Sequence, residues 1–261
     1  MGKINQVIKM KCRTDLADEN ENFSESKVTL QKNFGEIELL GIKGDKCKSF
    51  IINFKPDTLI LNSEDFKSAC IFALNLLKPE FFSKILVCGL GNPDITSDSL
   101  GIKTAEKIFV TAHMKKESAE NNIKEISSLT PDVAGKTGIE SFELIKSAAK
   151  LAKADLIIAI DSLCTSNPKR LCSTLQFSDG GIAAGSGIKK HTQKLDKENL
   201  NIPVIAVGMP TVIDIGKLTE KSVDLTVTPL NIDILIKKPA KYLAAAINSF
   251  LTDGLFSLPA E

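Results

Sequence analysis

Short, continuously apolar segments recur along the chain, and segments with helical periodicity separate them. The clearest are KILVCGL (84–90), ADLIIAID (154–161) and PVIAVGMP (203–210). An apolar run of this length, bounded by turn residues, is typical of a strand buried on both faces of a parallel sheet. The alternation with helices therefore predicts a single α/β domain with a mainly parallel central sheet flanked by helices.

Periodic and alternating patterns predict the remaining elements. Ser63 can cap a helix that extends to about Leu77, and Pro79 then ends it. The polar region 1–45 is expected to be partly helical and partly irregular. The other predicted elements are helices after Asp98, over 138–153 and on both sides of Pro239, and strands at 48–54, at the start of 125–137 and at 171–177.

Composition and charge exclude several classes of protein. The 261 residues are 43% hydrophobic and 25% charged, and the net charge is +1, so no overall field attracts nucleic acid or a membrane. No apolar run approaches the roughly 20 residues that a membrane-spanning helix needs. The first residues, MGKINQVIKMKC, lack the apolar core of a signal peptide. We therefore expect a cytoplasmic protein with no membrane partner.

Cysteine and histidine usage argues against metal and disulfide frameworks. None of the six cysteines forms a CxxC pair, so we expect free, buried thiols. His113 and His191 are the only histidines, and most metal sites would need one of them. Tryptophan is absent and tyrosine occurs once, so stacking platforms for single-stranded nucleic acid are not expected. The sequence predicts no cofactor and no metal.

Two aspartates lie at or beyond the carboxyl ends of predicted strands. Asp161 ends ADLIIAID, and Asp98 follows KILVCGL across a glycine-rich turn. Ligands bind outside the carboxyl ends of parallel strands, so these two acids are expected to share one crevice. Each also has a structural interpretation, because an acid can cap a helix or a turn. As a pair they form a candidate dyad, in which one carboxyl keeps a proton while the other acts as a base.

Glycine-rich segments could present backbone amides to a ligand. SDGGIAAGSGIKK (178–190) is the richest, and a flexible surface loop is its alternative interpretation. GLGNPD does not fit a dinucleotide-binding fingerprint, because Asp94 stands where the third glycine belongs. VAGKTG does not fit a phosphate-binding P-loop, because the first glycine is replaced by Thr130.

Seven segments, taken in order, add a more specific signal. They are RTDLADE (13–19), VCGLGNPDITSDSLG (87–101), PDVAGKTGIES (131–141), LIIAIDSL (156–163), STLQFSDGGIAAGSGI (173–188), IPVIAVGMPTVID (202–214) and VTPLNIDILIK (227–237). Together they resemble the spore germination protease family, the endopeptidases that degrade small acid-soluble spore proteins. The resemblance implies an aspartic-type endopeptidase with a phosphorylase/hydrolase-like fold, related in fold to hydrogenase maturation proteases.

The same resemblance implies residue roles and partners. Asp98 and Asp161 match the two catalytic aspartates of the family. The implied partners are small acid-soluble spore proteins as substrates and further copies in a homotetramer, and the implied location is the spore core or forespore. The family is made as a zymogen, which predicts a short leader or propeptide at 1–12 and a protease domain at 13–261. Separately from the resemblance, the free amides of the two glycine-rich loops and the GKTG lysine give the expected substrate and oxyanion contacts, which are Gly89, Gly91, Asn92, Lys136, Thr137, Ser178, Asp179, Gly185, Ser186 and Gly187.

Several alternatives remain open at this level. Lys136 could orient a substrate carboxylate or could be a solvated loop lysine, and Asp179 could be a third acid of the site or a turn former. A metal-dependent maturation protease would need a histidine with the carboxylates, because nickel favours imidazole. A non-enzymatic, peptide-binding paralogue is the third possibility, because this chain has Ala183-Ala184 where the family has His-Pro. The leading hypothesis is hydrolysis of a peptide bond by the two aspartates.

Overall fold

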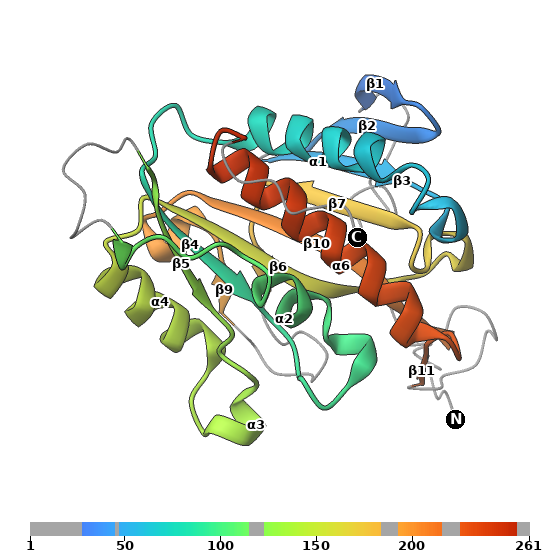
Figure 1. Ribbon diagram of the computed structural model, residues 1–261. Coiled ribbons are helices and arrows are strands. Elements are labelled where there is room, and N and C mark those ends of the chain that lie inside the picture. The colour runs from blue at the N-terminus through green and yellow to red at the C-terminus, as the bar shows by residue number, and fades with distance from the viewer. Residues whose placement is uncertain (1–27, 45–46, 115–122, 184–192, 216–224, 255–261) are drawn as a thin grey trace, which may run out of the picture.

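The computed structural model describes residues 28–44, 47–114, 123–183, 193–215 and 225–254. The strands of its main sheet are β1 (Val28–Phe34), β2 (Ile37–Lys43), β3 (Lys48–Asn53), β4 (Lys84–Gly89), β5 (Glu125–Leu129), β6 (Leu156–Thr165), β7 (Thr174–Ser178), β10 (Val204–Asp214) and β11 (Thr226–Val227). Their order is β1-β2-β3-β7-β10-β6-β4-β5, and β11 pairs with β10 (Figure 1). A separate ribbon joins β8 (Ile182–Ala183) and β9 (Lys194–Leu195).

The parallel part of the sheet contains the three predicted buried strands. Strands β10, β6, β4 and β5 run parallel, and β1, β2, β3 and β7 extend the sheet in antiparallel pairs. The predicted α/β class and its parallel core are confirmed. Strand β7 runs antiparallel to β10 because the connection from β6 is only residues 166–173, which is too short for a crossover to a parallel strand.

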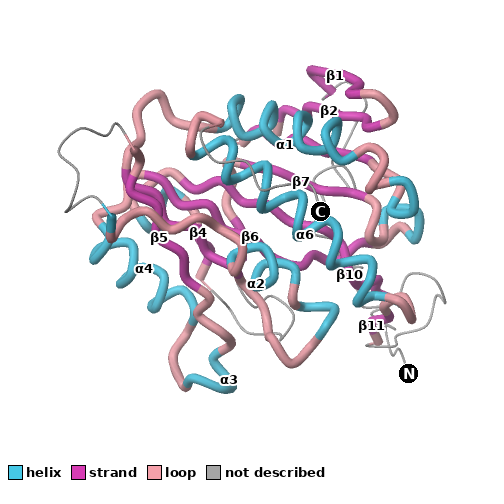
Figure 2. The backbone as a smooth tube through the Cα atoms, viewed as in Figure 1, coloured by secondary structure: helices cyan, strands magenta, loops and turns pink. Residues whose placement is uncertain are grey.

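Helices cover both faces of the sheet, which explains why the parallel strands β4, β6 and β10 contain long apolar runs. The helices are α1 (Ser63–Leu77), α2 (Leu100–Ala105), α3 (Ala134–Thr137), α4 (Ser141–Ala152), α5 (Lys197–Leu200) and α6 (Ile232–Leu251), with short 3-10 helices η3 (Pro56–Thr58), η4 (Thr96–Asp98) and η6 (Pro168–Arg170). One core packs α1, α2 and α6 against the sheet, and a second core on the other face contains α4 and residues of β9 and α5 (Figure 2). The predicted helix from Ser63 to about Leu77 is confirmed.

Two predictions about the ends of the chain differ from the structure where its residues are described. Residues 28–43 form a β-hairpin instead of partly helical structure, and Gly35 makes its turn with a φ of 56°. The C-terminal segment is one continuous helix, α6, although Pro239 lies inside it. An interior proline costs about 3 kcal/mol because it removes a helical hydrogen bond. Pro239 is buried, and α6 packs along both α1 and α2, so tertiary packing offsets that cost. The proposed leader, 1–12, lies outside the described residues.

The described cysteines are free thiols, as predicted, although not all of them are buried. Cys70, Cys88, Cys164 and Cys172 are buried, and Cys47 is partly exposed. Burial raises the pKa of Cys172 to about 12 and also raises the pKa of Cys70 and Cys88. These thiols therefore stay protonated, and they pack as small apolar side chains.

Candidate active site

Asp161 lies on the central parallel strand β6 and is 6% exposed. Its partner on the neighbouring strand β10 is Gly208, which has no side chain that could cover the Asp161 carboxylate. The backbone amide of Ser162 donates a hydrogen bond to Asp161 Oδ1 at 2.8 Å. A carboxylate is thus held on a rigid strand, near the carboxyl edge of the parallel sheet.

Asp98 reaches the same edge from the turn that follows β4. It ends η4, which contacts both β6 and β10. Thr211 of β10 anchors this short helix, because its Oγ1 donates a hydrogen bond to the Ser97 carbonyl at 2.6 Å. Burial raises the pKa of the Asp98 carboxyl, and a hydrogen bond from the Asn92 amide to Oδ2 at 2.9 Å acts in the opposite direction. The half-buried Asp98 is therefore the carboxyl that holds a proton more readily than an ordinary aspartate.

The glycines of the first turn are needed for close packing around Asp98. Gly91 has a φ of 120°, and a Cβ there would overlap the Asp98 carbonyl. A Cβ on Gly101, in the first turn of α2, would overlap backbone atoms of Leu90 and Ile160. At Gly89, a Cβ would lie 2.7 Å from the Ala105 side chain of α2. The glycines thus let β4, η4 and α2 pack closely enough to place Asp98 beside β6.

Two amides of this turn are already bound within the chain. The Leu90 amide donates to the Ile160 carbonyl at 2.8 Å, and the Asn92 amide donates to Asp98. The Asn92 side chain in turn accepts the Asp94 amide through Oδ1 at 3.0 Å. These groups therefore hold the turn and the carboxylate in place.

Lys136 forms ion pairs with carboxylates of its own chain. Its Nζ lies 2.8 Å from Asp94 Oδ2 and 3.2 Å from Asp132 Oδ2. The pKa of Lys136 is raised, chiefly by the hydrogen bond to Asp94. Thr137, beside it, donates through Oγ1 to the Ile139 carbonyl at 2.9 Å and stabilises the local turn. Lys136 thus joins the loop after β4 to the loop after β5.

The second glycine-rich segment begins away from the aspartates. Ser178 pairs with Ala206, two residues before Gly208, and its hydroxyl bonds that of Ser49 at 3.1 Å. The Lys48 amide donates to Asp179 Oδ1 at 2.7 Å. Because β7 runs antiparallel to β10, its last residues point to the amino edge of the parallel strands. The structure therefore does not bring Ser178 and Asp179 to Asp161, and Gly185, Ser186 and Gly187 lie outside the described residues.

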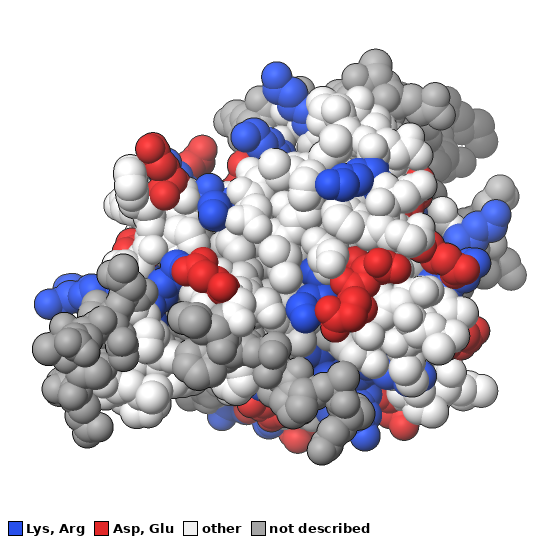
Figure 3. Space-filling view, turned by 45° about the horizontal axis from the view of Figure 1, so that its top comes forward, with Lys and Arg blue, Asp and Glu red and all other residues white. Residues whose placement is uncertain are grey.

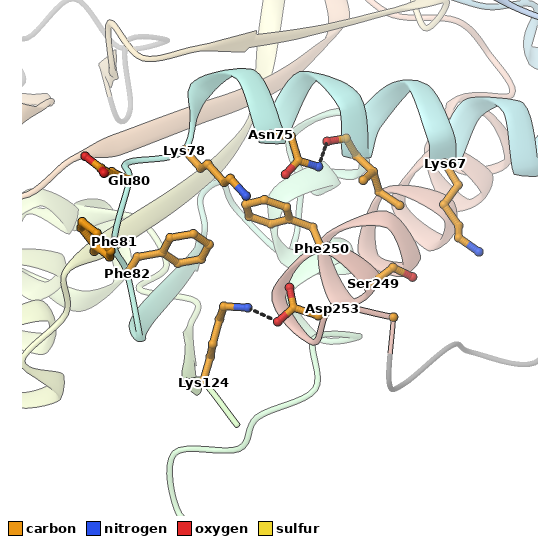
Figure 4. A pocket seen from close by; sticks show the side chains of 12 residues that line it. Lys67, Asn75, Lys78, Glu80, Phe81, Phe82, Lys124, Ser249, Phe250 and Asp253 are labelled. Atoms are coloured by element: carbon orange, nitrogen blue, oxygen red, sulfur yellow. Dashed lines mark hydrogen bonds and ion pairs between the residues drawn. The ribbon is translucent and has the colours of Figure 1, made fainter. Parts of the chain in front are cut away.

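A groove occupies the opposite, amino edge of the parallel strands. Phe82 stacks on Phe250 with ring centroids 5.6 Å apart, and Lys124 pairs with Asp253 at 2.6 Å (Figure 4). Lys124 immediately precedes β5, whereas Asp98 and Asp161 lie toward the ends of β4 and β6. This groove is thus separate from the aspartate pair.

The described residues give no metal cluster and no membrane segment. Among them, no group of three or more His, Cys, Asp and Glu side chains could hold a metal ion. His113 is exposed and follows Thr111, which bonds the amino half of β5, so it lies away from the aspartates. No helix in the described part of the chain has the length and apolarity to span a bilayer. On the face in Figure 3, acidic and basic side chains are scattered among uncharged surface.

Two features of the site were not identified from the sequence. Thr211 anchors η4 from a strand more than a hundred residues away, and it lies at an irregularity in the pairing of β10 with β6 that no local pattern predicts. Asp94 and Asp132 form the pairs with Lys136, and no local sequence pattern predicts the pair with Asp94. The spacing of Asp132 and Lys136, four residues apart, was the one local signal available for the second pair.

Comparison with known proteins identifies the family. The germination protease family profile matches residues 75–253, which is more than half of the chain. This chain therefore belongs to the germination protease family.

Individual relatives agree with this assignment. A germination protease of Bacillus licheniformis is 38% identical over 168 residues, which cover 63% of this chain and 46% of the relative. A germination protease of Bacillus velezensis is 36% identical over 207 residues, which cover 76% of this chain and 55% of the relative. The germination protease of Clostridium acetobutylicum is 35% identical over 206 residues, which cover 73% of this chain and 63% of the relative. The chain spans about half the length of the curated relatives it matches.

One solved structure shows a weaker similarity. A [NiFe] hydrogenase maturation protease, HycI from Thermococcus kodakarensis, matches with a TM-score of 0.38 and 19% sequence identity. The match covers 66% of this chain and 94% of that protein.

Proposed function

We propose that this chain is an endopeptidase that hydrolyses small acid-soluble spore proteins during germination. The observation that carries the proposal is the convergence of Asp98 and Asp161 from two elements toward one edge of the parallel sheet, within a chain of the germination protease family. Such an edge is where parallel α/β proteins bind their ligands. Two carboxyls there can share the acid and base roles of peptide hydrolysis.

The surroundings of each carboxyl suggest a division of roles. Burial raises the pKa of Asp98, so this carboxyl is the better candidate to carry the proton and donate it to the carbonyl oxygen or the leaving amine. Asp161 would then accept a proton from the attacking water. Because nearby carboxyls titrate as a pair, the pH dependence of cleavage would report two values that belong to both residues.

The test is direct cleavage of a small acid-soluble spore protein by the purified chain, with products identified by mass spectrometry. Asp98→Asn and Asp161→Asn should each abolish cleavage while the circular dichroism spectrum stays native. Asp155→Asn is a matched control, because Asp155 precedes the same strand β6 at its opposite end and bonds the amides of Ser83 and Lys84. Cleavage that survives in both single variants would refute the dyad. A chain that binds the substrate without product, with unchanged affinity in Asp161→Asn, would instead be a binding paralogue.

Processing, assembly and location are further parts of the proposal that rest on family membership. We propose a homotetramer in the spore core, made as a zymogen that removes a short segment before Arg13. Mass spectrometry of the aged protein would detect the new N-terminus, and light scattering would give the oligomeric state. An intact N-terminus together with full cleavage activity would refute the zymogen.

A further inference from the structure

The ion pairs of Lys136 connect the two loops that flank the carboxyl ends of β4 and β5. Asp94 belongs to the loop after β4, and Lys136 and Asp132 belong to the segment after β5. Strand β5 pairs only with β4 among the described strands, so it lies at the edge of the sheet. The Lys136 ion pairs therefore form a link across the open ends of β4 and β5, between the first loop and the second.

A continuous series of contacts extends from this link to the Asp98 carboxylate. Lys136 holds the Asp94 side chain, and the Asp94 amide donates to Asn92 Oδ1 at 3.0 Å. The Asn92 amide then donates to Asp98 Oδ2 at 2.9 Å. Each contact depends on the position of the 92–94 turn, because Asn92 faces Asp94 on one side and Asp98 on the other. A shift of this turn would weaken the hydrogen bond that favours the ionised form of Asp98.

We propose that Lys136 is a positioning residue, which acts through Asp94 and Asn92 to hold the Asp98 carboxyl in its working geometry. The effect of this positioning on catalysis rests on the proposed function. It also differs from direct binding of a substrate carboxylate by Lys136, because that role would require the lysine to exchange its two aspartate partners for the substrate. Asp132 is fixed in turn by the Val133 amide, which donates to its Oδ1 at 2.8 Å.

The decisive experiment measures the pKa of Asp98 by carbon-13 NMR of its carboxyl group in the full chain. It distinguishes two effects that would shift this pKa in opposite directions. Asp94→Ala removes a negative charge from the segment between β4 and α2 that also carries Asp98, and that loss alone could only lower the pKa of Asp98. If Asp94 instead holds the turn, the variant weakens the Asn92 hydrogen bond, and the pKa of Asp98 rises. We expect a rise in Asp94→Ala. A fall, or no change, would overturn the proposal.

Lysine variants give the second arm. Lys136→Met should raise the pKa of Asp98, Lys136→Arg should restore the native value, and Lys150→Met on the exposed face of α4 should have no effect. In cleavage assays, Lys136→Met should lower kcat and leave KM near the native value, because a positioning role does not touch the substrate. A raised KM with native kcat would overturn the proposal in favour of substrate binding. If the native chain cleaves nothing, the proposed function fails, and the NMR titration still decides the positioning role.

Discussion

Replacement of Thr211 by valine should detach the segment that carries Asp98 from the sheet. Thr211 is fully buried on β10, and its Oγ1 donates to the Ser97 carbonyl of η4 at 2.6 Å. Valine has nearly the same shape but no donor, so the Ser97 carbonyl loses its partner. Removal of one partner of a buried hydrogen bond costs about 1–3 kcal/mol. We therefore expect the free energy of unfolding to fall by about 1–3 kcal/mol.

Urea unfolding would measure this loss. Far-UV circular dichroism is the suitable probe, because the chain has no tryptophan and one tyrosine. With a denaturant slope of about 3 kcal/mol per molar urea, the midpoint should fall by roughly 0.3–1 M. Equal slopes for the native chain and the variant would show that the folded and unfolded states are otherwise comparable.

Thr211→Ser is the matched control, because it keeps the hydroxyl and loses only the buried methyl group. Burial of that methyl group contributes about 0.8 kcal/mol to stability. Both variants therefore lose stability, the serine variant through the lost methyl group and the valine variant through the lost hydrogen bond. Only Thr211→Val should misplace Asp98, and misplacement of a reacting group by about 1 Å can cost about 100-fold in rate. We expect kcat to stay near native in the serine variant and to drop about 10- to 100-fold in the valine variant. A valine variant with native stability and native kcat would refute the role of Thr211 as an anchor.

Three further perturbations test the packing and electrostatics around the site. Gly101→Ala should destabilise the chain by about 1–3 kcal/mol, because the added Cβ overlaps fixed backbone atoms, and the urea midpoint would report this loss. Asn248→Leu should cost about 1–3 kcal/mol in the same assay, because it removes the Oδ1 that accepts from the Phe109 amide and the Nδ2 that donates to the Lys107 carbonyl. Asp98→Asn should become more stable than the native chain as pH rises. Burial raises the folded-state pKa of Asp98, so the native chain loses stability as pH climbs from the ordinary carboxyl range through that raised value, whereas asparagine does not titrate.

Each of these predictions has a control on the same protein. Gly135→Ala should be tolerated, because no atom lies within 4 Å of a Cβ there. Asn75→Leu tests an exposed asparagine of α1 and should change stability little. For Asp98→Asn, urea midpoints measured below the ordinary carboxyl pKa and at about pH 7 should diverge only at the higher pH. A stability difference independent of pH would contradict the raised pKa, and a native-like Gly101→Ala would contradict the close packing of α2.

Local patterns along the sequence were sufficient for the parallel core and for the positions of both aspartates. Strands β4, β6 and β10 are buried on both faces, and such strands read as unbroken apolar runs in any window of the sequence. Once the strands are parallel, their carboxyl ends must lie at one edge. The sequence therefore predicts Asp98 and Asp161 at that edge from local patterns alone.

Tertiary structure alone decided how the other segments meet this edge. Strand β7 pairs antiparallel with β10, which directs Ser178 and Asp179 toward the opposite edge. Pro239 lies inside α6 because tertiary packing along the helix stabilises it. Local helix propensity does not predict this stabilisation. Thr211 and Lys136 reach the aspartate loops through contacts between segments distant in sequence. A sequence window fixes which faces of an element are apolar, whereas strand direction, register and the partners of polar side chains depend on the neighbours that the whole fold supplies.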